Sequence, residues 1–355
     1  MNLPDSMLKL VGNTPLIRLG RVNDGKGASV FVKLESTNPS GSYKDRMALA
    51  MVEAAEKGLT WNNKKLSPGG VVCDASAGNT APALAFVCAV KGYRARIGIY
   101  RTVLAGGGVR LKITGAYGPE VFECPPPTKY VPQSALDDLP TDERDLAWVI
   151  AGKMHMYELE RDNPDVVWVD QIYNRYNTVG QMGMGYEAYQ QLGGEIDAWG
   201  CSVGSGGTLY GVAMALREKG ARPTTFGTVP HGSESYLTLK KPEAVRGEFE
   251  ASKTRERLVE MMGLKKWQTE KSIVEEMIGA GYPDEFHRVS AEEARDMANR
   301  LCREEGIYCG MSSGANVHVA LKMARRMKKD QNVLTVIVDR RDRYLGEYPN
   351  DVYVV

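Results

Sequence analysis

Short apolar runs alternate with longer amphipathic stretches along most of this 355-residue chain, and this alternation limits the possible folds most strongly. The apolar runs, each of a length suited to a buried strand, are 30–34, 71–73, 95–100, 166–169, 198–203, 225–229 and 334–338. The helices predicted between them are 45–57, 81–90, 209–219, 291–305 and 315–328. This order predicts an α/β fold with parallel-type twisted sheets flanked by helices. In such folds, ligands bind where strands end and helices begin.

Length and composition narrow the class of protein. A chain of 355 residues suits two domains better than one small core. Its 45 basic and 44 acidic side chains nearly cancel, which argues against a nucleic-acid or membrane partner held by bulk charge. The longest apolar stretch, 83–90, is far too short for a membrane span, and the N-terminus lacks a signal-peptide pattern. We therefore expect a cytoplasmic protein.

Cysteines, histidines and insertions point to no further chemistry. The six cysteines form no CxxC and no metal-ligand spacing with a histidine, so we expect reduced structural thiols and no metal site. His231 follows a strand end and is interpreted as a loop surface residue. A polar stretch from 125 to about 143 is interpreted as a loop, and the charged stretch 240–271 as an exposed helix or excursion.

A lysine ends the first turn motif, Asn38-Pro-Ser-Gly-Ser-Tyr-Lys-Asp-Arg46, and a helix pattern follows it. Lys44 therefore projects from the start of a helix, where burial and the positive helix terminus both disfavour the ammonium form. A depressed pKa is what a lysine needs to form a Schiff base. Taken alone, a lysine after a turn is more often a solvated surface residue.

A second loop, Asp74-Ala-Ser-Ala-Gly-Asn-Thr-Ala-Pro82, lies between a strand and an apolar helix. Its backbone N–H groups and the side chains of Ser76, Asn79 and Thr80 suit a carboxylate or a ring oxygen. Ordinary helix capping by serine or asparagine is the more frequent use of such residues.

Two further turns, both containing glycine, also precede helices. The backbone of Val203-Gly-Ser-Gly-Gly-Thr208 can approach a phosphate closely, although the loop is neither a P-loop nor a full GxGxxG. In isolation, a tight turn that needs glycine explains it equally well. The last turn, Gly310-Met-Ser-Ser-Gly-Ala315, by itself fits a serine helix cap.

Together and in this order, these segments resemble the cysteine synthase and cystathionine beta-synthase family of pyridoxal-phosphate enzymes, with the fold type II, tryptophan synthase beta-like architecture. The opening Val11-Gly-Asn-Thr-Pro-Leu-Ile-Arg-Leu19 is very close to that family's start, and the similarity runs from about residue 8 to Leu345. The resemblance implies a smaller domain at 40–165 with the asparagine loop. It implies a larger domain at 1–39 plus 166–355 with the glycine loop, and a homodimer.

The resemblance also implies a role for each motif. Lys44 forms the internal aldimine with pyridoxal 5'-phosphate and later shuttles the α-proton. Asn79 hydrogen-bonds the ring hydroxyl of the cofactor, and Ser312 faces its pyridine nitrogen. The residues implied to hold the phosphate are Gly204, Ser205, Gly206, Gly207 and Thr208. The residues implied to meet the substrate carboxylate are Ser76, Asn79, Thr80 and Gln171.

A serine at the pyridine nitrogen has a chemical consequence. A neutral hydroxyl does not stabilise a protonated pyridinium as an aspartate would, so prompt loss of a β-leaving group is favoured. The aminoacrylate that results is open to attack by sulfide or a similar nucleophile. The leading hypothesis is therefore β-replacement on an O-activated L-serine, such as O-acetylserine or O-phosphoserine, in amino-acid biosynthesis.

Two other hypotheses stay open. One is β-elimination by a serine/threonine dehydratase or cysteine desulfhydrase of the same fold. The other is a cofactor-carrying binding protein that contacts a partner through 240–271. We expect a small amino-acid substrate, with no nucleic acid and no membrane as partner.

The departures from the family's pattern concern the substrate side. Synthases usually show Thr-Ser-Gly-Asn-Thr-Gly where this chain has Ser76-Ala-Gly-Asn-Thr-Ala81, whose Ser-Ala-Gly-Asn core resembles the dehydratases. The stretch 102–110 is glycine-rich where synthases have a Met-Ser start and an acidic residue. The segment Val338-Asp-Arg-Arg-Asp-Arg-Tyr-Leu345 keeps the synthase-like Arg-Tyr-Leu, but arginines replace the usual small residues before it, so that it contains Arg340, Arg341 and Arg343. They are suited to an anionic substrate such as phosphorylated serine, although solvated arginines near a chain end are the more ordinary interpretation.

Overall fold

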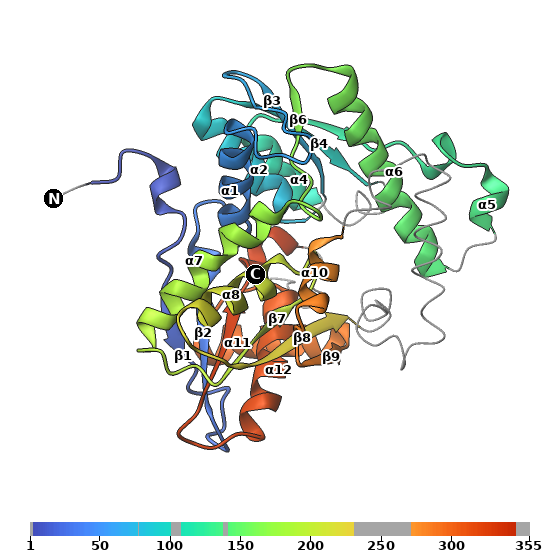
Figure 1. Ribbon diagram of the computed structural model, residues 1–355. Coiled ribbons are helices and arrows are strands. Elements are labelled where there is room, and N and C mark those ends of the chain that lie inside the picture. The colour runs from blue at the N-terminus through green and yellow to red at the C-terminus, as the bar shows by residue number, and fades with distance from the viewer. Residues whose placement is uncertain (1–2, 77, 101–107, 138–140, 231–270, 346–355) are drawn as a thin grey trace, which may run out of the picture. The chain divides into compact units, whose positions relative to one another are not determined.

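The computed structural model describes residues 3–76, 78–100, 108–137, 141–230 and 271–345 (Figure 1). The chain divides into two compact units, which we call unit 1 and unit 2. As far as they are described, unit 1 comprises 1–50, 175–231 and 279–355, and unit 2 comprises 51–174 and 232–278. The domain boundaries expected from the sequence, 40–165 and 1–39 plus 166–355, stay a prediction.

Unit 1 is built on a six-stranded sheet in the order β1-β2-β10-β7-β8-β9. Its strands are β1 (Leu16–Arg18), β2 (Ser29–Leu34), β7 (Ala198–Ser202), β8 (Thr224–Pro230), β9 (Glu285–Val289) and β10 (Asn332–Ile337). β1 runs antiparallel to β2, and the other neighbouring pairs are parallel. Ser29 pairs with Asn332 and Leu34 with Ile337, so the blue β2 lies beside the red β10 in Figure 1.

Helices cover this sheet through apolar faces. The helices of unit 1 are α7 (Arg175–Gln191), α8 (Gly207–Glu218), α11 (Ala291–Glu305), α12 (Met311–Arg325) and the first part of α1 (Lys44–Glu56). α11 begins with a capping box at Ser290 and ends at Gly306, whose backbone is left-handed. α12 packs on α11 and on β10, while α7 packs on α8. Val30, Val32, Val333 and Ile337, at alternating strand positions, are buried in one core with Val317 of α12.

Unit 2 contains a four-stranded parallel sheet in the order β5-β4-β3-β6. Its strands are β3 (Val71–Ala75), β4 (Arg94–Ile99), β5 (Glu120–Glu123) and β6 (Val166–Trp168). Its helices are α2 (Thr80–Lys91), α4 (Gly108–Ala116), α5 (Gln133–Asp137), α6 (Thr141–Asp162), α10 (Ile273–Gly279) and the rest of α1. All five residues of β3 are buried, as expected for an inner parallel strand. Ile150 and Met154 of α6 pack in a core with Cys73 and Val166 of the sheet.

The structure confirms the predicted α/β class, and each of the seven predicted strands is present. The interpretation of 125–143 as a loop is wrong, because α5 and the start of α6 fall within it. His231 and residues 240–270 lie outside the described residues. No helix in the described ranges has both the length and the apolar character needed to cross a membrane.

Candidate functional site

Lys44 is the first residue of α1, where the turn motif predicts it. Its ammonium nitrogen lies 4.7 Å from the centre of the Tyr43 ring. Burial lowers the pKa of Lys44 to about 8, and only the thiolate form of Cys201 would act in the opposite direction. Burial also raises the pKa of the Cys201 thiol, so this neighbour stays neutral. The Lys44 amine is therefore far more easily deprotonated than that of a solvated surface lysine, whose pKa is about 10.4.

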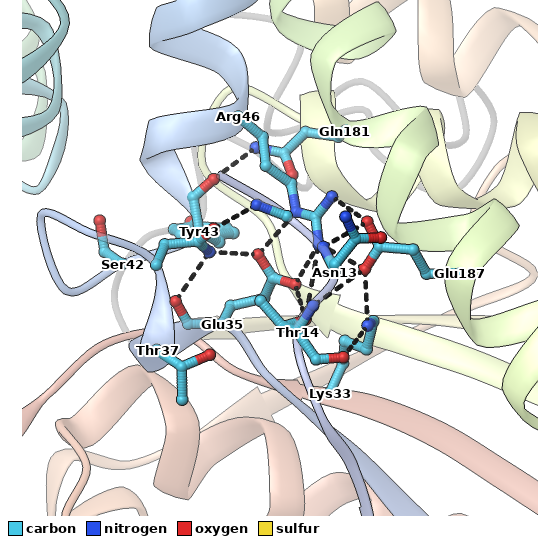
Figure 2. Close-up of polar contacts among 12 residues, drawn as sticks. Asn13, Thr14, Lys33, Glu35, Thr37, Ser42, Tyr43, Arg46, Gln181 and Glu187 are labelled. Atoms are coloured by element: carbon cyan, nitrogen blue, oxygen red, sulfur yellow. Dashed lines mark hydrogen bonds and ion pairs between the residues drawn. The ribbon is translucent and has the colours of Figure 1, made fainter. Parts of the chain in front are cut away.

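A network of buried ions anchors the turn that carries Lys44 (Figure 2). Arg46 donates two hydrogen bonds to Glu35, both of 2.8 Å, and two to Glu187, of 2.7 and 2.8 Å. Lys33 makes a second ion pair with Glu187 at 2.7 Å. The two cations and two anions balance, and each Arg46 pair has the bidentate geometry that fixes a guanidinium most firmly. Because Arg46 follows Lys44 by two residues, the network holds the first turn of α1.

Further hydrogen bonds hold the turn itself. The side chain of Asn38 accepts from the backbone N–H of Gly12 at 2.8 Å. The backbone N–H of Ser40 donates to the Asp45 carboxylate at 2.7 Å, and Arg343 donates to the Ser40 carbonyl. Burial raises the pKa of Asp45 to about 6. The turn is thus a rigid element of unit 1.

The interpretation of the C-terminal arginines as solvated is wrong for two of the three. Arg341 and Arg343 are only 4% and 2% exposed, whereas the side chain of Arg340 is 58% exposed and pairs with Asp342. Arg343 is buried because its guanidinium caps a carbonyl of the lysine turn. It therefore has a structural task and is not a freely available anion ligand.

The glycine loop connects β7 to α8, which begins at Gly207. Gly206 has a φ of +88°, a conformation that favours glycine. A Cβ at Gly207 would stand 2.4 Å from Oδ1 of Asn177, whose Nδ2 donates to Ser205 at 3.0 Å. At Gly204, by contrast, a Cβ would meet no atom within 4 Å. The geometry of the tight turn therefore requires glycine at positions 206 and 207. It does not require glycine at Gly204, where space beside the backbone is open to a ligand.

Three of the predicted motifs meet inside unit 1, near the carboxyl ends of β7 and β10. The backbone N–H of Tyr43 donates to the Val338 carbonyl at 3.0 Å, and the Val338 N–H donates to the Ser313 hydroxyl at 2.9 Å. Thr208 of the glycine loop lies close enough to the Tyr43 phenol to lower its pKa, against the larger effect of burial, which raises it. Gln181 of α7 donates to the Tyr43 carbonyl at 3.1 Å (Figure 2). The lysine turn, the glycine loop and the start of α12 are thereby tied together.

Ser312 is the second residue of α12, and the helix cap is Gly310. The interpretation of this turn as a serine helix cap is therefore wrong. Its neighbour Ser313 is fully buried, whereas Ser312 keeps partial exposure. The Ser312 hydroxyl therefore lies partly exposed at the start of α12, next to the lysine turn and the glycine loop.

The asparagine loop belongs to unit 2 and leads from β3 into α2. Asn79 occupies the N-cap position, but its side chain makes no capping hydrogen bond, so the capping interpretation fails there. The Ser76 hydroxyl accepts from the Gly78 N–H at 3.2 Å. The Thr80 hydroxyl donates to Oε1 of Gln171 at 2.6 Å. The structure therefore brings together two of the residues implied to meet a carboxylate, which are 91 positions apart in the chain.

The sequence does not single out several buried charges next to these motifs. One example is the ion pair between Arg46 and Glu187 in unit 1. Another is the pair between Lys153 and Asp170 in unit 2. Lys153 does leave a signal, because it is an isolated charge within the apolar helical run 147–156. Its partner is 17 residues away on another element, and spacing alone does not predict that pairing.

Comparison with known proteins gives concordant results. The family described as pyridoxal-phosphate dependent enzyme matches residues 7–339. Cysteine synthase B of Escherichia coli (strain K12) is 32% identical over 95% of this chain and 93% of its own length. Cysteine synthase of Staphylococcus aureus (strain Mu50) is 30% identical over 96% of both chains.

Solved structures add two similar folds. The structure of O-ureido-L-serine synthase has a TM-score of 0.73 and 26% identity, with 97% of this chain and 94% of that chain covered. A hydrogen sulfide-producing enzyme from Fusobacterium nucleatum also has a TM-score of 0.73 and 26% identity, with 97% and 99% covered.

Proposed function

The chain belongs to the pyridoxal-phosphate dependent enzymes of the cysteine synthase type, and from this premise we propose that it catalyses β-replacement on an O-activated L-serine. The observation that carries the proposal is Lys44, a half-buried lysine that starts α1 and whose pKa is lowered to about 8. The nucleophile we propose is sulfide or a close analogue. The donor we propose is O-acetylserine or O-phosphoserine.

The residues of unit 1 fit pyridoxal 5'-phosphate. The cofactor needs an amine for its aldehyde and a cradle for its phosphate. Lys44 offers the amine, and the glycine loop offers backbone N–H groups at the positive start of α8. The open space at Gly204 lets a phosphate approach the backbone. When bound, the cofactor supplies an electron sink for the α-carbon of an amino acid.

The proposed work of Lys44 is to hold the cofactor and then to move a proton. A neutral amine at Nζ can accept the α-proton of the substrate and return it later. An ordinary lysine is almost fully protonated near neutral pH, whereas one with a pKa of about 8 has a useful neutral fraction. Arg46 and its carboxylate partners keep the helix start in place during this transfer.

The residues proposed for the substrate carboxylate are Ser76, Asn79, Thr80 and Gln171. Hydroxyl and amide donors together with the N–H groups at the start of α2 suit a carboxylate. The hydrogen bond from Thr80 to Gln171 supports a joint role for these two side chains. Ser312 is proposed to face the pyridine nitrogen with a neutral hydroxyl, and this favours early loss of a β-leaving group.

A second candidate reaction is β-elimination, which releases a keto acid and ammonia. The similarity to the hydrogen sulfide-producing enzyme of Fusobacterium nucleatum supports it. The Ser76-Ala-Gly-Asn79 sequence supports it as well, because it resembles the dehydratase pattern. The two reactions differ in whether an added nucleophile or water ends the cycle.

One experiment separates them. The purified holoenzyme is mixed with O-acetyl-L-serine, O-phospho-L-serine or L-serine, with and without sulfide, and thiol amino acid and pyruvate are both quantified. We expect sulfide to divert product from pyruvate to cysteine with at least one donor. Pyruvate formation that sulfide does not reduce would replace the proposal by β-elimination. No product of either kind from any donor would overturn both.

We also propose a homodimer located in the cytoplasm. Leu3, Met7, Leu10 and Ile17 are 79%, 48%, 46% and 39% exposed, which places four large apolar side chains on the surface within the first 17 residues. Because exposed apolar surface is typical of protein–protein interfaces, these side chains support the proposed dimer.

A further inference from the structure

A buried ion pair lies next to Gln171 in unit 2. Nζ of Lys153 on α6 is 2.5 Å from Oδ1 of Asp170, and the two side chains are only 6% and 3% exposed. The ammonium also lies 5.3 Å from the centres of the Trp168 and Tyr173 rings, within the range of a cation–π contact. A cation enclosed in this way is fixed in position by several partners.

Asp170 shapes the backbone on which Gln171 sits. Its φ of +43° lies in the left-handed region, which is unusual and strained for a residue other than glycine. Its Oδ1 accepts from the N–H of Ile172 at 3.3 Å, which closes the turn around Gln171. Oδ2 of Asp170 is buried and has no hydrogen-bond partner among the described residues. The carboxylate therefore depends on Lys153 for its neutralisation.

A second buried carboxylate, Asp74, holds Gln171 from the other side. The backbone N–H of Gln171 donates to Oδ2 of Asp74 at 3.3 Å, and Trp168 Nε1 donates to Oδ1 at 3.2 Å. Nε2 of Gln171 donates to the Ala75 carbonyl at 3.2 Å, while its Oε1 accepts from Thr80. Every one of these contacts lies within unit 2, at the end of β3 and β6.

The charge balance explains why Lys153 matters for this arrangement. Burial raises the pKa of Asp74 to about 6, whereas Lys153 lowers it and Asp170 raises it. Lys153 is thus the cation shared by two carboxylates that both hold the Gln171 segment. If the ammonium were removed, the carboxylates would have to take up protons or move apart, and either change would shift the hydrogen bonds of Gln171.

We propose that Lys153 is a positioning residue for substrate recognition, which acts through Asp170 and Asp74 to hold Gln171 in the orientation that receives the substrate carboxylate. This inference rests on the proposed function of Gln171 and goes beyond it. An apolar residue in place of Lys153 would fill the same space without the cost of desolvating a charge. The buried ion pair is therefore better explained by its effect on the orientation of Gln171 than by a gain in folding stability.

The test compares Lys153→Met with wild type as holoenzymes. Lys153→Met keeps the length of the side chain and removes its charge. The dissociation constant of O-acetyl-L-serine, followed by the change in visible absorption of the cofactor, and the KM are expected to rise about tenfold, as for a misplaced hydrogen bond to a charged group. The kcat is expected to stay within about twofold, because the groups of unit 1 are unchanged.

Lys91→Met is the matched control. Lys91 is also a partly buried lysine of unit 2, with a side chain 17% exposed and 3.1 Å from Glu56, and it is the last residue of α2, which starts at Thr80. Its loss removes an ion pair of unit 2 that is more exposed than the Lys153 pair, without touching Gln171. A KM of Lys153→Met that equals that of Lys91→Met would overturn the proposal. If Lys153→Met does not fold, Asp170→Asn is judged by the same criterion.

Hydrogen exchange measured on the substrate-free protein separates this inference from the proposed function. Amides of 169–174 are expected to exchange faster in Lys153→Met than in Lys91→Met. If no donor changes the spectrum of wild type, the proposed function fails, and faster exchange still supports the positioning by Lys153. If donors bind normally and exchange is unchanged, the positioning role fails alone.

Discussion

Lys44 combines the position and the environment that its chemistry requires, and each has a different origin. The turn before it places the lysine at a helix start, which the sequence predicts. Its desolvation comes from the tertiary structure, where Cys201 is a neighbour that no local pattern indicates. The sequence therefore predicts which lysine is used, and only the fold explains why its amine is reactive.

The pH dependence of Lys44 modification tests this environment. In protein freed of cofactor, the rate of acylation at Lys44 is expected to rise with a midpoint near pH 8, because burial disfavours the ammonium form. Mass spectrometry of peptides labelled at a series of pH values measures it. Lys26, whose side chain is 81% exposed, serves as an internal reference for the reagent. A Lys44 midpoint that coincides with that of Lys26 would contradict the assigned environment.

Two glycines of the same loop should respond differently to substitution. Gly207→Ala is expected to destabilise the fold by about 1–3 kcal/mol, because the new Cβ would collide with Asn177. Gly204→Ala has open space, so its unfolding midpoint should match wild type while its affinity for pyridoxal phosphate falls about tenfold or more. Urea unfolding and cofactor titration measure the two effects. Unaltered cofactor affinity in Gly204→Ala would argue against a phosphate at this loop.

At the scale of elements, the network around Arg46 joins α1, β2 and α7. Burial by itself would raise the pKa of Glu187, but hydrogen bonds from Arg46 lower it to about 2. Lys33 also lowers the pKa of Glu187, but Arg46 contributes more to keeping Glu187 ionised. Segments at both sides of the lysine turn are thus fixed by one guanidinium.

This network predicts a pH-dependent stability. Since the folded pKa of Glu187 lies below the ordinary glutamate value of 4.5, its contribution is complete above pH 4.5 and is lost as the pH falls towards 2. The contribution is about 3 kcal/mol. Glu187→Gln should therefore be less stable than wild type at pH 7, and the difference should shrink at pH 3 in denaturant unfolding. An equal difference at both pH values would contradict this account.

Strands and helices were predicted correctly from the sequence where it contains continuous apolar runs. They were missed where polar or charged residues interrupt such runs. The inner strands were predicted because parallel strands buried on both faces are continuously apolar. The edge strands β5 and β9 were missed because exposed and half-buried residues such as Glu120, Glu123 and Glu285 interrupt them. The helices between 125 and 162 were missed in part because prolines and charges at the start of that region suggest a loop.

At the scale of the molecule, motifs predicted the type of chemistry better than the contacts that support it. The order of five short motifs along the chain was sufficient to identify the family. The contacts between Arg46 and Glu187, 141 residues apart, and between Thr80 and Gln171, 91 apart, required the fold. Lys153 was overlooked for the same reason, because its significance depends on residues brought to it by β3 and β6.

The proposed homodimer gives a prediction at this scale. Light scattering of wild type is expected to give twice the mass of one chain. Leu10→Glu introduces a charge among the exposed apolar side chains of the N-terminal segment and should shift the protein towards the monomer. Arg94→Glu, at a side chain 66% exposed in unit 2, is the control for an added surface charge. A dimer that persists in Leu10→Glu would place the interface elsewhere.

The pairing of β2 with β10 has a consequence for synthesis of the chain on the ribosome. Roughly 300 residues separate the two strands, so at typical elongation rates β2 waits roughly 15 to 60 s for its neighbour to emerge. The sheet of unit 2, which spans residues 71–168, is translated completely within that interval. The polypeptide therefore carries an incomplete β-sheet with an open edge through most of its translation, and this is the period in which it depends most on protection by chaperones.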